Sequence, residues 1–525
     1  MARLTEVYLL STPLENDYKH TLYFNSREGQ ESYFRSKIVH YFPELSYQRK
    51  EGFVRVDKDF DELQNVNYLM YKNEKGKTYY AFITEVRYIS DGVSWIFFEI
   101  DVIQTWLFDY TVKPSFVERE HVSDDTIGLH TVPEVVETGE YITNSHRKDT
   151  KLDDYCIILG VTENVSIDGV DTGNVKPTLY GGIFSGVRYI AFPAKDLRNV
   201  IATIEGYQQG HSDAIVCLFM CPIFLTGIEA GATDPNTGES LWLGGKIEGY
   251  ADPKTYDITY QKDYYLDGYI PRNNKLLTYP YNYLLVSNNN GASAIYKYEL
   301  FSGEQVEFVV DGVITPGCSI RMVPINYNRT SRYDEGGINL GKFPICSWTS
   351  DVYTNWLTQN SVNIGIDMAK NLGQVAIGVA TAGTGVGAGV AVSGLVGIAS
   401  SVGQIYQQSF TPPQANGNIN CGDVISGGKR NTFHFYNMSV KREYAEIIDN
   451  YFDMFGYKVN RVKTPNIHHR SRYWFTKTID VNIDGAIPMK DMQKIKYCYN
   501  TGITLWRNGD EIGDYSLSNE IKNIV

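Results

Sequence analysis

Hydrophobic and polar residues alternate along most of the chain in short runs that end at turn residues. Eight Asn-Gly or Asp-Gly pairs separate these runs, and they begin at Asp91, Asp168, Asp267, Asn290, Asp311, Asn416, Asp484 and Asn508. Such pairs accept the positive φ angles of tight hairpin turns. The clearest pattern surrounds Asp91, where residues 77–90 and 93–106 are rich in Tyr, Phe, Val, Ile and Trp. It predicts a long β-hairpin.

Two other segments carry a helical period. Between Lys441 and Gly456, apolar residues recur every three or four positions, which predicts a helix that packs one face on a sheet and stops at the glycine. The apolar positions are Tyr444, Ile447, Ile448, Tyr451, Phe452 and Phe455. A second helix is expected from Tyr353 towards Leu372. The whole pattern predicts a mainly β, multi-domain protein of barrel or sandwich type with a few α-helices.

One stretch departs from this pattern. The 52 residues between Lys370 and Asp423 contain no Asp, Glu, Lys or Arg. Their centre, residues 375–403, holds eight Gly and six Ala among Val, Ile and Leu. It exceeds the roughly 20 residues that a helix needs to cross a bilayer, yet each Gly costs about 1 kcal/mol in a helix relative to Ala. Glycines spaced as GxxxG would let backbones approach closely in lipid.

Several interpretations of this Gly-rich segment stay open. A buried helix would not need so many glycines, and a flexible linker would be richer in Ser and polar residues. A permanent anchor would carry a basic cytoplasmic flank, whereas one end here is the Pro412-Pro413 break. About 120 residues follow it. We therefore expect a conditional membrane-inserting loop, formed by a single helix or by a hairpin.

Composition excludes some classes of protein. The chain has 525 residues, 40 of them Tyr, with a net charge of −13. That charge has the wrong sign for a generic nucleic-acid binder. The seven cysteines are scattered without a CxxC pair, so we expect reduced, buried thiols and synthesis in a reducing cytoplasm. Cys217 and Cys221 fall in an apolar run that predicts a core strand. The N-terminus shows no signal peptide.

A search for catalytic chemistry finds little. The chain has no HExxH, GxSxG or GxxxxGK[ST] motif. The adjacent pair His468 and His469 would point to opposite faces of a strand, and the run 234–238 lacks the later acidic ligand of a calcium loop. Acidic pairs such as Asp124-Asp125 and Asp153-Asp154 are typical of solvated loops. We expect no enzymatic activity, no catalytic residues, no metal and no cofactor.

Five separated motifs resemble a known family. They are PLENDYKHT (Pro13 to Thr21), FEIDVIQTWLF (Phe98 to Phe108), SFVEREHV (Ser115 to Val122), FGYKVNRVKTPN (Phe455 to Asn466) and TGITLW (Thr501 to Trp506). Together with the preceding Gly-rich segment, they resemble the tail-knob, or distal tail-tube, proteins of small short-tailed, protein-primed bacteriophages (picovirus-type podoviruses) of Gram-positive hosts. The motifs cover roughly the first 125 and the last 170 residues. The middle carries no recognisable match.

The resemblance implies a structural virion protein at the tail tip. It implies a homohexameric tube, joined to the upper tail or lower collar protein, whose lumen passes viral DNA without sequence-specific binding. It also implies that apolar loops plug the tip and then enter the host cytoplasmic membrane as a pore for genome ejection. The residues expected to insert are Val375, Ala376, Ile377, Val379, Val386, Val390, Val392, Leu395, Val396 and Ile398.

The expected organisation has four parts. Residues 1–126 form a tube β domain, 127–347 a β-rich middle, 348–428 a helix and the membrane-active tip loop with apolar core 375–403, and 429–525 an α+β segment packed with the first domain. The basic run in FGYKVNRVKTPNIHHRSR could bind phosphate. A strand and its loop, whose cations pair across a subunit contact, is the favoured interpretation.

Three competing functions predict different results. A receptor-binding adhesin would bind teichoic acid or polysaccharide through exposed aromatic residues of the middle region, such as Trp242. A cell-wall hydrolase would clear purified peptidoglycan. A pore-forming toxin acting alone would carry a secretion signal and lyse cells at low concentration.

Overall fold

The protein is described from a computed structural model that divides into two compact units. Unit 1 comprises residues 1–141, 265–281 and 440–525, and unit 2 comprises 142–264 and 282–439. The structure describes residues 5–45, 47–48, 52–73, 76–152, 154–161, 166–167, 170–171, 179–180, 183–184, 188–193, 215–227, 245–247, 254–289, 291–314, 319–327, 337–340, 345–347, 432–467 and 469–522.

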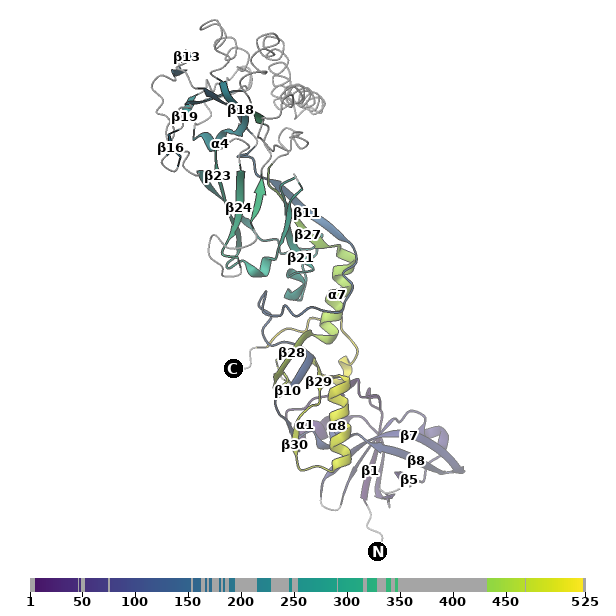
Figure 1. The fold of residues 1–525 in the computed structure, drawn as a ribbon. Helices are drawn as coiled ribbons and strands as arrows, with labels where there is room; N and C mark the ends of the chain where they lie inside the picture. Colours follow the sequence, from purple (N-terminus) through teal and green to yellow (C-terminus); the bar gives the residue numbers. More distant parts are fainter. Residues whose placement is uncertain are drawn as a thin grey trace, which may run out of the picture. The chain divides into compact units, whose positions relative to one another are not determined.

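A seven-stranded antiparallel sheet begins unit 1 (Figure 1). Its strand order is β3-β1-β6-β7-β8-β5-β4. The strands are β1 (Thr5–Leu10), β3 (Ile38–Leu45), β4 (Tyr47–Gln48), β5 (Phe53–Val56), β6 (Tyr68–Lys72), β7 (Thr78–Ser90) and β8 (Val93–Ile100). β7 and β8 form the predicted hairpin, and Gly92 has the positive φ of 73° that its turn requires. Helix α1 (Arg27–Ser36) and the 3₁₀ helix η1 (Phe60–Leu63) lie between these strands in the sequence.

A five-stranded sheet in unit 1 joins the two ends of the chain. Its order is β2-β31-β29-β10-β28, and only β2 and β31 run parallel. The strands are β2 (His20–Leu22), β10 (Ser115–Glu120), β28 (Tyr457–Lys463), β29 (Tyr473–Ile479) and β31 (Ile503–Trp506). A small pair joins β9 (Tyr110–Val112) and β30 (Ile483–Gly485). The helical elements are α2 (Val102–Trp106), η5 (Asn274–Leu277), α7 (Arg442–Phe455), α8 (Met489–Thr501) and η9 (Gly509–Glu511).

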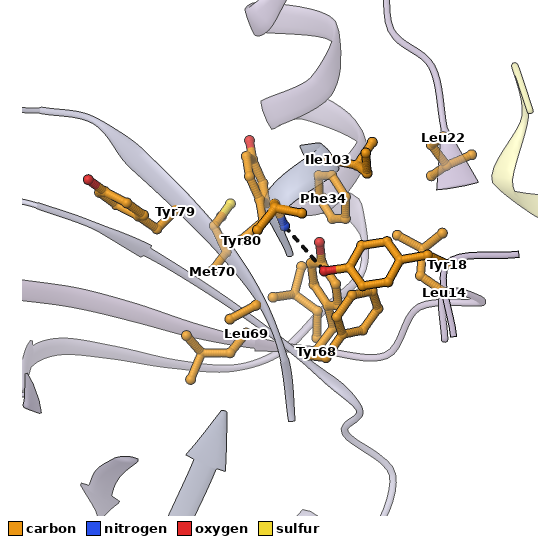
Figure 2. Packing of buried hydrophobic residues seen from close by; sticks show 14 of the residues in the cluster. Leu14, Tyr18, Leu22, Phe34, Tyr68, Leu69, Met70, Tyr79, Tyr80 and Ile103 are labelled. Atoms are coloured by element: carbon orange, nitrogen blue, oxygen red, sulfur yellow. Dashed lines mark hydrogen bonds between the residues drawn. The ribbon is translucent and has the colours of Figure 1, made fainter. Parts of the chain in front are cut away.

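Aromatic side chains fill the main core of unit 1. The ring of Phe34 on α1 stacks on the ring of Tyr68 of β6, with 5.3 Å between the ring centroids. Its centroid lies 4.6 Å from that of Tyr80 of β7. Figure 2 shows these rings together with Tyr18 and Ile103. The same cluster includes the fully buried Trp506 of β31. Residues from both termini therefore share one hydrophobic core, in which edge-to-face and offset ring contacts add to the burial energy.

The predicted C-terminal helix is confirmed as α7, with Gly456 at its end. One expected contact is wrong. Ile447 is 65% exposed, whereas its neighbour Ile448 and Phe452 are buried. The helix buries a stripe that also contains Asp449, a polar residue that the hydrophobic pattern did not mark. The buried side is therefore rotated away from Ile447, and tertiary hydrogen bonds to Asp449 decide that rotation.

Within the residues that the structure describes, unit 2 contains three larger sheets and two short hairpins. Their orders are β11-β27-β21-β22, β19-β17-β12-β18-β26, β20-β23-β24-β25, β13-β14 and β15-β16. The strands are β11 (Tyr141–Lys148), β12 (Tyr155–Val161), β13 (Ser166–Ile167), β14 (Val170–Asp171), β15 (Leu179–Tyr180), β16 (Ile183–Phe184), β17 (Arg188–Pro193), β18 (Ile215–Pro222), β19 (Gly245–Ile247), β20 (Lys254–Gln261), β21 (Asn282–Ser287), β22 (Ser293–Tyr296), β23 (Gln305–Val313), β24 (Ser319–Ile325), β25 (Ile338–Leu340), β26 (Ile345–Ser347) and β27 (His434–Val440). The described part of unit 2 also contains the short α4 (Ile223–Thr226) and η6 (Tyr298–Leu300).

These elements confirm a mainly β protein with a few helices. The apolar run that contains Cys217 and Cys221 forms strand β18, as predicted, and Phe219 and Cys221 are buried in it. The described cysteines Cys156, Cys221 and Cys498 are buried free thiols. Two expected turns are wrong, because Asp311-Gly312 and Asp484-Gly485 lie inside strands β23 and β30.

Candidate functional site

The Gly-rich segment lies outside the described residues, together with all ten positions expected to insert into a membrane and the helix expected from Tyr353. Its flanks are described. β26 ends at Ser347 in one sheet of unit 2, and β27 begins at His434 in another. Both strands pair with earlier parts of the chain. The segment is therefore an insertion between two strands that belong to the same unit.

The return point of this insertion is tied firmly to unit 2. The hydroxyl of Thr432 donates to the backbone oxygen of Asp149 at 2.8 Å, and the N–H of Asp149 donates to the backbone oxygen of Phe433 at 2.9 Å. Thr432 and Phe433 are fully buried. A hydrogen bond also joins the ring nitrogens of His146 and His434, which lie 3.0 Å apart. We call Asp149, Thr432 and Phe433 the return anchor.

Two cations of the basic run near β28 are neutralised inside the chain. Lys463 pairs with the buried carboxylate of Glu120, and Arg472 donates to Glu511 at 2.7 Å. Arg470 donates to the backbone oxygen of Val122 at 2.9 Å. The predicted strand is confirmed, but these partners lie in the same chain, so a subunit contact is wrong for Lys463 and Arg472. Arg461 pairs with Val117 in the β10–β28 ladder, but its side chain is exposed and makes no hydrogen bond or ion pair with any described residue.

A buried ionic group beside this strand was missed from the sequence. The side chain of Glu134 is fully buried and forms ion pairs with Arg119 and Lys275. It also accepts the backbone N–H of Lys458 at 2.9 Å. Burial lowers the pKa of Lys275, and the neighbouring carboxylate of Glu134 acts in the opposite direction. The two cations and the backbone N–H thus bind both oxygens of the Glu134 carboxylate. These contacts hold the segment before β11 against the rest of unit 1.

In the acidic pair of Asp124 and Asp125, Asp124 is exposed as expected, whereas Asp125 is half-buried and does not lie in a fully solvated loop. Hydrogen bonds from Thr126 lower the pKa of Asp124, while burial raises the pKa of Asp125, which accepts the backbone N–H of Asn274 at 3.0 Å. Asp153, His468 and the run 234–238 are outside the described residues. Within the part of the chain that the structure describes, no group of three His, Cys, Asp or Glu side chains could hold a metal ion.

Among the helices that the structure describes, none is both long enough and apolar enough to cross a bilayer.

Comparison with known proteins identifies the family. A family model described as the C-terminal domain of tail knob protein gp9 of Bacillus phage phi29 matches residues 247–520, more than half of the chain. The chain belongs to the gp9 tail knob protein family. A second model, the N-terminus of the caudoviral major tail protein, matches residues 3–111. That span contains the whole seven-stranded sheet, so a tail-tube role is supported for this tail knob protein.

Individual tail knob proteins are similar over almost the full length. The chain is 26% identical to tail knob protein gp9 of Bacillus phage B103, covering 99% of both chains. It is 25% identical to tail knob protein gp9 of Bacillus phage phi29, covering 98% of both. The structure of the bacteriophage C1 tail knob protein gp12 shares the fold, with a TM-score of 0.65, 17% identity and coverage of 99% and 100%.

These findings confirm the family that the five motifs indicated. They also show that the similarity extends beyond the parts of the chain that the motifs cover. The relatives also cover residues 127–347, where the sequence motifs gave no match. The protein is a structural component of the phage tail and of the virion.

Proposed function

We propose that this tail knob protein forms the distal tail tube through which viral DNA passes, and that its Gly-rich segment plugs the tip and enters the host cytoplasmic membrane during ejection. One observation carries the proposal. Residues 3–111 of this chain match the N-terminus of the caudoviral major tail protein. The same chain contains 52 consecutive residues without Asp, Glu, Lys or Arg. The ten apolar positions from Val375 to Ile398 are the proposed inserting residues.

The flanks of the segment support a loop over a terminal anchor. Both flanking strands belong to unit 2, and the return anchor is buried and hydrogen-bonded. A loop held at such a root can change environment while the sheets that carry it stay folded. Small residues would let six such loops pack against each other in the virion and again within lipid.

The acidic charge supports passage of DNA without retention. A subunit with a net charge of −13 gives an assembly of copies that repels phosphate. We propose a hexamer that joins the upper tail or lower collar protein. Its action is conformational and involves no enzymatic step, since the named relatives are tail knob proteins. Adhesion to a wall polymer and hydrolysis of peptidoglycan are tested by glycan binding and by a zymogram.

Release of dye from liposomes tests membrane insertion. The intact protein should release dye, and a chain without residues 369–408 should not, while light scattering shows the same assembly state for both. A chain with Val390→Asp and Val392→Asp should also fail, because a charge at the centre of a bilayer costs roughly 3 kcal/mol or more. Ile447→Asp on the exposed side of α7 is the matched control and should release dye normally.

No release by the intact protein between pH 4 and pH 8 would contradict membrane insertion. Misfolding of the deletion variant would instead assign a structural role to the segment, and the two Asp substitutions would then decide whether its apolar residues act on lipid.

A further inference from the structure

Three apolar side chains lie exposed in a row on the five-stranded sheet of unit 1. Phe116 of β10 is directly opposite Val462 of β28 on one side and Ile479 of β29 on the other. Their exposed fractions are 36%, 69% and 54%. Residues that are directly opposite on neighbouring strands have Cβ atoms about 5 Å apart, so the three form a continuous surface. Contact with another surface would remove this row from water.

The row adjoins an open and cationic strand edge. β28 is the last strand in its sheet, so one of its backbone edges has no neighbouring strand among the residues that the structure describes. Lys458 and the exposed Arg461 lie on this strand. Successive residues point to opposite faces, so Arg461 and Val462 flank the open edge. We call these residues the cationic edge: Phe116, Lys458, Arg461, Val462 and Ile479.

Unit 1 also carries a surface of opposite character at the end of the β7–β8 hairpin. β6 pairs with β7 only at residues 78–82, so the far part of β7 has β8 as its one strand neighbour within the described structure. Tyr88 and Ile89 are 55% and 41% exposed there. The carboxylate of Asp59 accepts the N–H of Gly92 and thereby joins the acidic stretch before β6 to the hairpin turn. Glu62 in this stretch is paired with Lys58. We call these residues the acidic tip: Asp57, Asp59, Asp61, Tyr88, Ile89 and Asp91.

We propose that the cationic edge of one copy binds the acidic tip of the next copy. Both surfaces combine exposed apolar side chains with an open strand edge, and their charges are complementary. Because they are different surfaces of one chain, the contact is heterologous, and repeated contacts generate a ring when the rotation closes. The inference rests on the proposed tail tube of identical subunits and names the surfaces that join them.

The apolar row favours protein over DNA as the occupant of the cationic edge. Phosphate binding uses cations and polar donors, and exposed Val, Ile and Phe side chains add nothing to it. A second copy offers Tyr88 and Ile89 to cover the row and carboxylates to neutralise Arg461. The chain as a whole is acidic, so one copy attracts another mainly where a cationic surface is presented.

Two single variants and their mixture test the proposal. Val462→Glu places a carboxylate in the apolar row of the cationic edge. Tyr88→Lys replaces an exposed aromatic residue of the acidic tip by a cation. Each full-length variant alone should be monomeric in sedimentation velocity at concentrations where the unchanged chain assembles. Mixed in equal amounts, they should form a dimer and nothing larger, because the intact tip of one variant still fits the intact edge of the other. Ile447→Glu is the matched control, 65% exposed, and should assemble normally.

Several results would overturn the proposal. They are normal assembly of Val462→Glu, monomers only in the mixture, or no self-association of the unchanged chain up to about 100 μM. Loss of duplex DNA binding by Val462→Glu with unchanged assembly would assign the cationic edge to DNA instead. Failure of dye release with normal assembly would contradict membrane insertion and leave this contact intact.

Discussion

The Nδ1 atom of His121 accepts a hydrogen bond from the backbone N–H of Phe475 at 2.6 Å. Its other ring nitrogen lies 2.8 Å from the backbone oxygen of Asp453 and therefore carries the proton. A neutral imidazole satisfies both groups at once. His121 thus links the end of β10 to β29 and to the last turn of α7.

This histidine should make unit 1 sensitive to acid. Burial, and then the charge of Arg470, lower the pKa of His121 to about 3. The unfolded value is about 6.5, so stability from the neutral ring is complete above that pH and is lost as the pH falls toward 3. The full shift corresponds to roughly 5 kcal/mol. Urea unfolding between pH 7.5 and pH 4 should show the loss.

The variant His121→Gln separates this effect from general acid sensitivity. Glutamine is uncharged at all these pH values, so the free energy of unfolding of the variant should depend less steeply on pH than that of the unchanged protein. His130→Gln, at a partly exposed position in the same unit, is the control and should keep the original slope. Equal slopes for His121→Gln and the unchanged protein would show that His121 titrates normally.

Asp101 should have the opposite pH dependence. Its buried carboxylate accepts the N–H groups of Ile103 and Gln104 at 3.0 Å and the hydroxyl of Tyr68 at 2.8 Å. Burial raises its pKa to about 6 despite these bonds. Its contribution is therefore complete below the unfolded pKa near 3.9 and is lost as the pH rises through 6.

The difference in the free energy of unfolding between Asp101→Asn and the unchanged protein measures this pH-dependent contribution of Asp101. Asparagine keeps an acceptor for the start of α2 and has no charge to bury, so the variant should gain about 2 kcal/mol relative to the unchanged protein between pH 4 and pH 7.5. Asp101→Ala should be about 1 to 2 kcal/mol less stable than Asp101→Asn at every pH, because alanine also has no charge but removes the helix cap. A constant difference for Asp101→Asn across this range would refute the raised pKa.

Gly456 should tolerate no side chain. It ends α7 with a φ of 63°, and an added Cβ would lie 2.1 Å from the backbone oxygen of Glu120. Gly456→Ala should lose about 3 kcal/mol or more, because backbone must move on both sides of the contact. Gly513 has a φ of 85° and nothing within 4 Å of that position. Gly513→Ala should cost only about 1 kcal/mol, and similar thermal shifts for both would contradict the steric account.

Local patterns predicted the elements well where neighbouring residues alone decide them. The β7–β8 hairpin follows from alternation around Asp91-Gly92, and α7 follows from its period and Gly456. Asp311-Gly312 looks the same in sequence but pairs with Arg321 and Ile320 inside a ladder. Pairing with a distant strand outweighs the turn preference there, and that partner is not visible from the local sequence.

The buried polar groups were beyond the reach of these patterns. Glu134 lies in a segment without helix or strand, and its partners Arg119 and Lys275 are distant in sequence. Distant partners also explain why Asp449 is buried on α7 while Ile447 is exposed. The carboxylate of Asp449 accepts hydrogen bonds from Tyr269 and Asn273. The five sequence motifs identified the family without any knowledge of which side chains are buried, because a motif match does not depend on the direction in which a side chain points.

The return anchor should hold the end of the Gly-rich segment more weakly when Thr432 is replaced by valine. Valine has nearly the same shape, so the change removes one donor and leaves the buried oxygen of Asp149 without it, at a cost of about 1 to 2 kcal/mol. Chymotrypsin should then cut after Phe433 several-fold faster, because opening of this strand end exposes the bond. Thr226→Val in the same unit, where the hydroxyl bonds to Ile223 at 2.7 Å, is the control. Equal cutting at Phe433 in both variants would show that Thr432 does not hold the strand, and a faster cut confined to Thr432→Val would locate the root of the loop at this contact.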